Sequence, residues 1–374
     1  MNARLALLIL LALSLKLAHA APQVLFQNYK IHTVKTSDNV GLKVLELLGP
    51  NQQPMQTARP IVLMHGFTSN WHNWVLVGDT YRKSGLRVFI VNWRGHGQGS
   101  HRSVVLGEAF NTHDPRYNYH RLATQDVPTV IDFAYRLSGK KVIYQSHSMG
   151  GMMANLAFSG VKMDSHGKVS VSMEQGRQFE NKVHAYIPVA APNSLRMKEY
   201  IGSRFLQYGL NLMGINGDRS DNIVLPFQAS RTRIAYWTLR ANPLLRGLIN
   251  LEFMSPEEYG TMSQHGVSDV PRALSENLYE MNRDFYGTED RQVNYEEISQ
   301  ARGTSPFCRT RIPELMISAY TESLAMIDQQ VALAKRRQYR HVRLPKAGHV
   351  DIMAGTVGAQ RVVSETLNFV RQVK

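Results

Sequence analysis

The stretch that decides the fold is KKVIYQSHSMGGMMANLAF, residues Lys140 to Phe158. An apolar run ends abruptly at Ser148, and a run of small, helix-forming residues follows at once. A sharp turn from a strand into a helix exposes a serine hydroxyl beside backbone N–H groups, and it needs small residues two positions before and after that serine. Ser146 and Gly150 are small, although glycine is usual at the first position. We therefore interpret Ser148 as a nucleophile at a strand-to-helix elbow rather than as part of an ordinary strand-end turn.

The rest of the chain alternates between β-rich runs and segments with helical periodicity. Most of the β-rich runs are almost continuously apolar, which is typical of parallel strands covered on both faces. The sequence thus predicts an α/β fold with a mostly parallel central sheet and helices on both faces. The six runs that carry this prediction are Tyr29–Thr33, Pro60–Met64, Val88–Trp93, Lys141–Gln145, Val183–Val189 and Glu314–Ala319.

The alternation stops between about Pro192 and Arg311, where only helical patterns occur. We predict a helical insertion over residues 193–311, which is either a lid or cap over a site on the sheet or a packing subdomain. The two parts of the core are then residues 21–192 and 312–374. In the second part we expect a helix around Gln329–Lys335, a strand near His341–Leu344 and a last helix over Gln360–Val373.

A nucleophilic serine needs a base and an orienting acid, which in this architecture follow in the chain order Ser, Asp/Glu, His. The segment LPKAGHVDIMAG places His349 in a loop after the last predicted strand. The acid is expected after strand PELMISA, where Glu322 is the first choice and Asp328 the second.

The oxyanion formed during attack also needs hydrogen-bond donors. The segment IVLMHGFTSNW places Phe67 just after a predicted strand, and its backbone N–H is expected to act together with that of Met149; the alternative is a plain turn. The glycine-rich segment RGHGQGSH lacks dinucleotide-binding spacing. The chain has no H-E-x-x-H motif and no paired cysteines, so we expect neither a metal nor a cofactor.

The first twenty residues, MNARLALLILLALSLKLAHA, combine a positive start, a short apolar run and Ala-His-Ala. This pattern predicts a signal peptide over residues 1–20 and an exported, periplasmic or secreted protein. The apolar run is shorter than the roughly 20 residues that a membrane-spanning helix needs. The single cysteine, Cys308, excludes an intrachain disulfide, so the core must hold the fold unaided.

The net charge is +14, to which Arg4 and Lys16 of the leader contribute two charges. Export and the absence of a nucleic-acid-binding signature argue against a nucleic-acid partner. Plain solubility is the default role of the charge, and weak association with an anionic membrane surface is the alternative. The sequence leaves the oligomeric state open.

The chain resembles the acid-lipase-like branch of the α/β-hydrolases, the group that contains gastric and lysosomal lipases and bacterial relatives. The resemblance rests on VLMHGFTSNWHNW, NWRGHGQGSH, YNYHRLATQDVPTVIDFAYRLSGKKVIYQSHSMGG, IPELMISAYTESLA and AGHVDIMAG. It implies Ser148 as nucleophile, Glu322 at the acid position, His349 as base, and Phe67 and Met149 as oxyanion donors. The chain departs from the family at two positions, with serine at 146 and glutamate at 322.

These observations predict an exported serine hydrolase that cleaves carboxylic esters of lipid-like or other apolar acyl groups through an acyl-enzyme. Two alternatives stay open. The same triad could act on another bond, as in an aminopeptidase, a thioesterase or a polyhydroxyalkanoate depolymerase. The scaffold could also serve a binding protein without catalysis.

Overall fold

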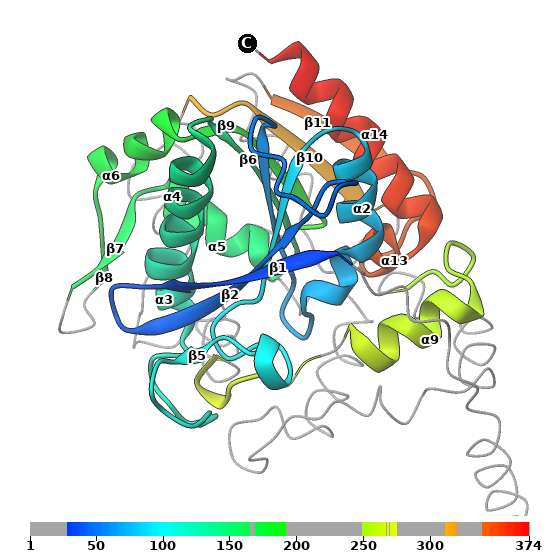
Figure 1. Cartoon of the computed structure of the whole chain (residues 1–374). Helices are drawn as coiled ribbons and strands as arrows, with labels where there is room; N and C mark the ends of the chain where they lie inside the picture. Colours follow the sequence, from blue (N-terminus) through cyan, green and yellow to red (C-terminus); the bar gives the residue numbers. More distant parts are fainter. Residues whose placement is uncertain are drawn as a thin grey trace, which may run out of the picture.

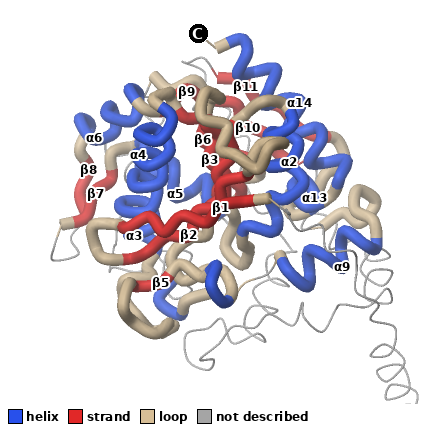
Figure 2. The backbone as a smooth tube through the Cα atoms, in the orientation of Figure 1, coloured by secondary structure: helices blue, strands red, loops and turns tan. Residues whose placement is uncertain are grey.

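The computed structural model describes residues 28–164, 169–191, 249–266, 268, 270–274, 311–319 and 339–373. A nine-stranded sheet runs through the molecule in the order β1-β2-β4-β3-β6-β9-β10-β11, with β5 paired to β2 (Figures 1 and 2). The strands of this sheet are β1 (Tyr29–Lys35), β2 (Val40–Leu47), β3 (Pro60–Met64), β4 (Arg87–Val91), β5 (Val104–Val105), β6 (Val142–His147), β9 (Val183–Val189), β10 (Glu314–Ala319) and β11 (Tyr339–Leu344). A small two-stranded sheet pairs β7 (Val161–Met163) with β8 (Val169–Val171).

Six neighbouring strands, from β4 through β3, β6, β9 and β10 to β11, run parallel. The β1–β2 hairpin is antiparallel and adds an antiparallel edge through the β2–β4 pair. Because the carboxyl ends of parallel strands meet at one edge, the loops after β3, β6 and β11 converge there. The predicted mostly parallel α/β sheet is confirmed.

Helices cover both faces of the sheet (Figure 1). On one face lie α2 (Val75–Lys83) and α14 (Thr356–Gln372), and on the other lie α4 (Val127–Ser138) and α5 (Met149–Phe158). In β3, Ile61 and Leu63 join the core with α2 and α14, whereas Val62 and Met64 join the core with α4 and α5. Since successive side chains point to opposite faces, a strand buried on both sides must be apolar throughout.

The remaining described helices have at most ten residues each. They are η1 (Trp71–Trp74), η2 (Gly99–His101), α3 (Tyr119–Arg121), η3 (Leu122–Asp126), α6 (Met173–Gln178), η4 (Phe179–Asn181), α9 (Pro256–His265) and α13 (Asp351–Ala354). Helix α9 lies within the predicted insertion and begins with a capping box, in which Ser255 and Glu258 satisfy each other's backbone N–H groups.

The six predicted strands are confirmed to within a few residues, as is the strand near the C-terminus. The sequence reading missed β2, because Lys43 and Glu46 interrupt its apolar pattern. The structure accommodates Glu46 by ion pairing: its carboxylate accepts hydrogen bonds of 2.7 Å from Arg87 Nε and from His32 Nε2. The last helix begins at Thr356, four residues earlier than predicted.

Other predictions fall on residues outside the described ranges. These are the signal peptide, the helix around Gln329–Lys335 and most of the insertion, including its N-terminal boundary. The division of the chain into two core parts and an insertion therefore stays a prediction.

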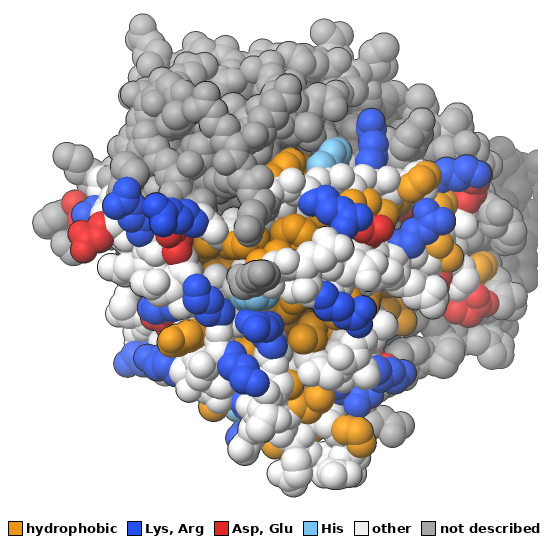
Figure 3. Space-filling model, turned by 90° about the horizontal axis from the view of Figure 1, so that it is seen from above, with side chains coloured by type: hydrophobic (Ala, Val, Ile, Leu, Met, Phe, Trp, Pro, Cys, Tyr) orange, Lys and Arg blue, Asp and Glu red, His pale blue; other side chains and the backbone are white. Residues whose placement is uncertain are grey.

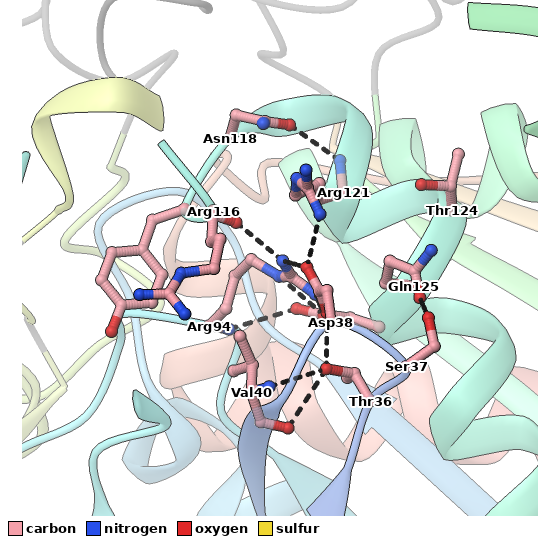
Figure 4. Close-up of polar contacts among 12 residues, drawn as sticks. Thr36, Ser37, Asp38, Val40, Arg94, Arg116, Asn118, Arg121, Thr124 and Gln125 are labelled. Atoms are coloured by element: carbon pink, nitrogen blue, oxygen red, sulfur yellow. Dashed lines mark hydrogen bonds and ion pairs between the residues drawn. The ribbon is translucent and has the colours of Figure 1, made fainter. Parts of the chain in front are cut away.

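A buried ion network fixes the loop after β4 (Figure 4). The guanidinium of Arg94 is fully buried and lies 2.6 Å from Asp126 and 2.7 Å from Asp38. Arg121 adds a second cation 2.9 Å from Asp38. Burial raises the pKa of Asp38, but hydrogen bonds and charge from Arg94 outweigh it and hold that pKa well below the usual range. The network joins the β1–β2 turn to the segment before α4.

Candidate active site

Ser148 occupies the junction between β6 and α5, as the sequence predicts for an elbow. Its φ of 51° and ψ of −122° are unusual for a residue with a side chain and cost on the order of 1–3 kcal/mol. The backbone compensates through hydrogen bonds: Ser148 N–H donates to Val189 C=O at 3.0 Å, and Ser148 C=O accepts from Gly151 N–H at 2.9 Å. The residue is half-buried.

The glycines after the serine are required by close packing. A Cβ on Gly150 would lie 2.8 Å from the backbone oxygen of His65, and one on Gly151 would lie 2.2 Å from Ala191 Cβ. Ser146 is fully buried in β6 between β3 and β9, where it pairs with Met64 and Pro188. The elbow therefore accommodates a serine at the position where glycine is usual.

The structure brings His349 against Ser148. His349 lies in the loop after β11, and its Nε2 is 2.8 Å from Ser148 Oγ, across 201 positions of sequence. A hydroxyl donates to an unprotonated ring nitrogen in this arrangement, which is the contact a general base needs in order to take the serine proton. Both residues were predicted as partners from the sequence, and they are adjacent.

The loop of His349 is held by a buried carboxylate that the sequence reading missed. Asp351 accepts a 2.9 Å hydrogen bond from Gly348 N–H and a 2.6 Å hydrogen bond from Asn250 N–H. Burial raises the pKa of Asp351 to about 6, against the opposing effect of these two bonds. The carboxylate two residues after the histidine, in the sequence AGHVD, was the available signal.

His147 also contacts this loop. Its Nε2 donates to the backbone C=O of His349 at 2.8 Å, and the two ring centroids are 4.9 Å apart. Burial, and then the charge of His349, lowers the pKa of His147 to about 3, so the ring is neutral. In the elbow pattern His147 is the variable residue before Ser148, and no role was predicted for it.

The turn after β3 lies directly beside the elbow. A Cβ on Gly66 would lie 3.2 Å from Ser148 Cβ. His65 Nδ1 is 2.7 Å from Gly66 C=O, while Trp93 N–H donates to His65 Nε2 at 3.2 Å. Because C=O and N–H point in opposite directions across a trans peptide, holding Gly66 C=O also orients the N–H of Phe67.

Histidines brace this turn at two carbonyl groups. His96 Nε2 lies 2.7 Å from Phe67 C=O, one peptide beyond the bond that His65 makes. Burial, with a further contribution from His96, places the pKa of His65 well below its ordinary value, so His65 is neutral. Phe67 and Met149, the two predicted donors, thus lie in two segments that pack against each other.

The predicted acids, Glu322 and Asp328, lie outside the described residues. The strand before them, β10, ends at Ala319, which is paired with Leu344 at the end of β11. The ends of β10 and β11 therefore lie side by side, and the segment after β11 carries His349.

The described residues contain no group of three or more histidine, cysteine, aspartate or glutamate side chains suited to a metal ion. Within the same residues, no helix has the length and apolarity to cross a membrane.

The face of the molecule in Figure 3 carries many Lys and Arg side chains around apolar ones and fewer Asp and Glu. This distribution agrees with the net charge of +14.

Comparison with known proteins agrees with the geometry. The family described as alpha/beta hydrolase fold matches residues 59–160, which include the turn after β3 and the elbow. Human Lipase member M is 28% identical over 47% of this chain and 40% of its own length. Gastric triacylglycerol lipase of Bos taurus is 28% identical over 35% of this chain and 34% of its own.

The likeness to solved structures extends over most of the chain. A thermophilic esterase from Thermogutta terrifontis superposes with a TM-score of 0.52 and 16% identity, covering 92% of this chain and 98% of that one. At this identity the likeness shows the fold alone. The chain spans only 34–40% of the length of the two lipases. The sheet, the elbow and these similarities together show that the chain has the α/β-hydrolase fold and that part of it is similar to lipases.

Proposed function

We propose that this protein is a serine hydrolase that cleaves carboxylic esters of lipid-like or other apolar acyl groups. The observation that carries the proposal is the 2.8 Å contact between His349 Nε2 and Ser148 Oγ at a strained elbow. A surface serine has no need of a backbone conformation that costs folding energy, and strain of this kind clusters at functional sites.

In the proposed mechanism Ser148 Oγ attacks the ester carbonyl carbon while its proton passes to His349 Nε2. The carbonyl oxygen becomes an oxyanion, which accepts hydrogen bonds from the N–H groups of Phe67 and Met149. The protonated His349 then gives the proton to the leaving alcohol, and an acyl-enzyme remains. Water, deprotonated by His349, attacks that ester, and the acid product leaves as Ser148 regains its proton.

Glu322 is the proposed acid of the triad, and Asp328 is the second candidate. Either residue follows β10, whose end lies beside the end of β11. A carboxylate bonded to Nδ1–H would hold the tautomer in which Nε2 accepts the Ser148 proton.

The described part of the insertion holds a buried apolar cluster that packs against Ala354 and Val350, next to the loop that carries His349. Its members are Ile249, Leu251, Met254, Tyr259 and Met262. The relatives named above, a lipase and a triacylglycerol lipase, are consistent with an apolar acyl substrate.

We further propose that residues 1–20 are removed on export, from the leader pattern at the start of the chain. N-terminal sequencing of the protein recovered from a secreting host tests this directly. A first residue of Ala21 supports the proposal, and a retained Met1 contradicts it.

The activity is tested by pairing ester hydrolysis with covalent labelling. A fluorophosphonate forms a bond between Ser148 Oγ and phosphorus as fluoride leaves, so it reports an activated serine independently of the ester used. We expect hydrolysis of nitrophenyl acyl esters and stoichiometric labelling, both abolished in Ser148→Ala with little change in Tm. Faster turnover of aminoacyl anilides than of esters would assign the triad to amide bonds. Absence of both labelling and turnover would indicate a binding protein.

A further inference from the structure

We infer that His147 is a positioning residue for the base: it holds the backbone of His349 and so couples the nucleophile elbow to the base loop. The inference rests on the proposed function, because it concerns how Ser148 and His349 are kept in register. It assigns a role to a side chain that the proposed mechanism itself does not use.

The hydrogen bond between His147 and His349 has a fixed donor and acceptor. The backbone C=O of His349 can only accept, so the 2.8 Å bond requires the proton on His147 Nε2. The opposite nitrogen, Nδ1, faces the turn after β3: a Cβ on Gly66 would lie 3.2 Å from it. The imidazole ring is therefore placed between the turn that carries Phe67 and the loop that carries His349.

The bond from His147 to His349 affects the nucleophile because His147 and Ser148 are neighbours in the chain. His147 directly precedes Ser148, and both are fixed where β6 pairs with β9, with His147 opposite Val189. The nucleophile and the donor that holds the base therefore move together. A misplacement of about 1 Å between reacting groups can cost about 100-fold in rate, so a tether of this kind affects the chemical step.

The neutral state of His147 suits a position beside the base. During attack His349 becomes positively charged, and the two ring centroids are 4.9 Å apart. A second cation at that distance would oppose protonation of His349, because like charges disfavour each other's charged forms. Neutral His147 supplies the hydrogen bond without that opposing charge.

Asp351 holds the same loop one residue before His349, through Gly348 N–H. Unlike His147, it also binds Asn250 N–H and so connects the loop to the insertion. Its loss is expected to disturb packing as well as position. The contribution of position alone is therefore best measured at His147.

The test compares three variants with wild type by fluorophosphonate labelling rate, ester kcat and KM, and Tm. His147→Leu removes the donor, whereas His147→Gln keeps an N–H near the position of Nε2. His184→Leu is the matched control: His184 is a half-buried histidine on β9 that also bonds a backbone group, at Val370, near the opposite end of the sheet.

For His147→Leu we expect the labelling rate and kcat to fall by about tenfold or more. KM should stay within about twofold of the wild-type value, because the lost contact positions the base rather than the substrate. His147→Gln is expected to recover most of the labelling rate. His184→Leu should lower Tm at most, without slowing labelling.

Labelling of His147→Leu at the wild-type rate would overturn the inference, as would an equal loss in the Gln and Leu variants. If His147→Leu does not fold, His147→Asn replaces it, since its shorter amide does not reach His349 C=O. These outcomes are separate from the proposed function, which is judged on the labelling and substrate turnover of wild type.

Discussion

Ser148 Oγ and His349 Nε2 lie 2.8 Å apart although 201 positions separate them in the sequence. The contact joins two loops at the carboxyl edge of the parallel sheet, one after β6 and the other after β11. The strands that precede these loops, β6 and β11, are not neighbours in the sheet. Both loops leave the sheet at the same edge because β6 and β11 run parallel, with β9 and β10 between them.

Glu322→Gln is expected to lower kcat by about 10³–10⁴ with little change in KM, because the triad carboxylate fixes the tautomer of the base and stabilises its charged form. Asp328→Asn is the matched change and should have a much smaller effect. Steady-state kinetics on a nitrophenyl ester measures both. A large loss in Asp328→Asn with a mild loss in Glu322→Gln would move the acid to Asp328.

Ser146→Gly restores the residue usual at this position and should keep kcat within about tenfold, or roughly 1.4 kcal/mol of barrier. Ser146 is fully buried, so its hydroxyl has no access to a substrate. The comparison is with Ser148→Ala under the same conditions. A collapse of activity to the level of that variant would show that Ser146 takes part in the chemistry.

Arg94→Met is expected to reduce the free energy of unfolding by about 3–5 kcal/mol, since it leaves the carboxylate of Asp126 buried without its cation. Arg116→Met removes an arginine whose pairs with Glu108 and Asp114 are more exposed, and it should cost about 1 kcal/mol or less. Chemical denaturation of both variants gives the two values. Equal losses of unfolding free energy in the two variants would mean that burial does not determine how much these ion pairs contribute to stability.

His72 is expected to make the fold sensitive to acid. Burial, with the charges of His265 and His101, lowers its pKa to about 3. In the unfolded chain the pKa of this histidine has its ordinary value of about 6.5. Between pH 3 and pH 6.5, roughly, the unfolded chain therefore binds a proton that the folded state does not bind. The contribution of His72 to the free energy of unfolding is therefore fully present above about pH 6.5. It is lost as the pH drops towards 3, by about 1.4 kcal/mol per pH unit at most.

His72→Gln should flatten this part of the pH dependence, whereas His113→Gln, at an exposed histidine, should leave it unchanged. Denaturation curves between pH 7.5 and about 4 measure the slope. Some acid sensitivity will remain, because the pKa values of His65 and His147 are lowered in the same direction. A slope identical to that of wild type would refute the assignment to His72.

The sequence by itself determined the features that depend on chain neighbours. Continuous apolar runs such as Pro60–Met64 predict strands buried on both faces, because each run must serve two cores. The small residues around Ser148 predict the elbow, because close backbone packing at Gly150 and Gly151 admits no side chain. His349 could also be selected among fourteen histidines, because chain order in this architecture places the base after the last strand.

Tertiary structure alone decided the distant contacts that neither a motif nor chain order predicts. Strand β2 exists in spite of Glu46 because Arg87, 41 positions away, neutralises that carboxylate in the core. The bond from His147 to the backbone of His349 spans 202 positions, and that from Asn250 to Asp351 spans 101. Such contacts depend on the order and register of the strands, which place loops side by side irrespective of their separation in the chain. A pattern read within a few residues carries no information about that placement.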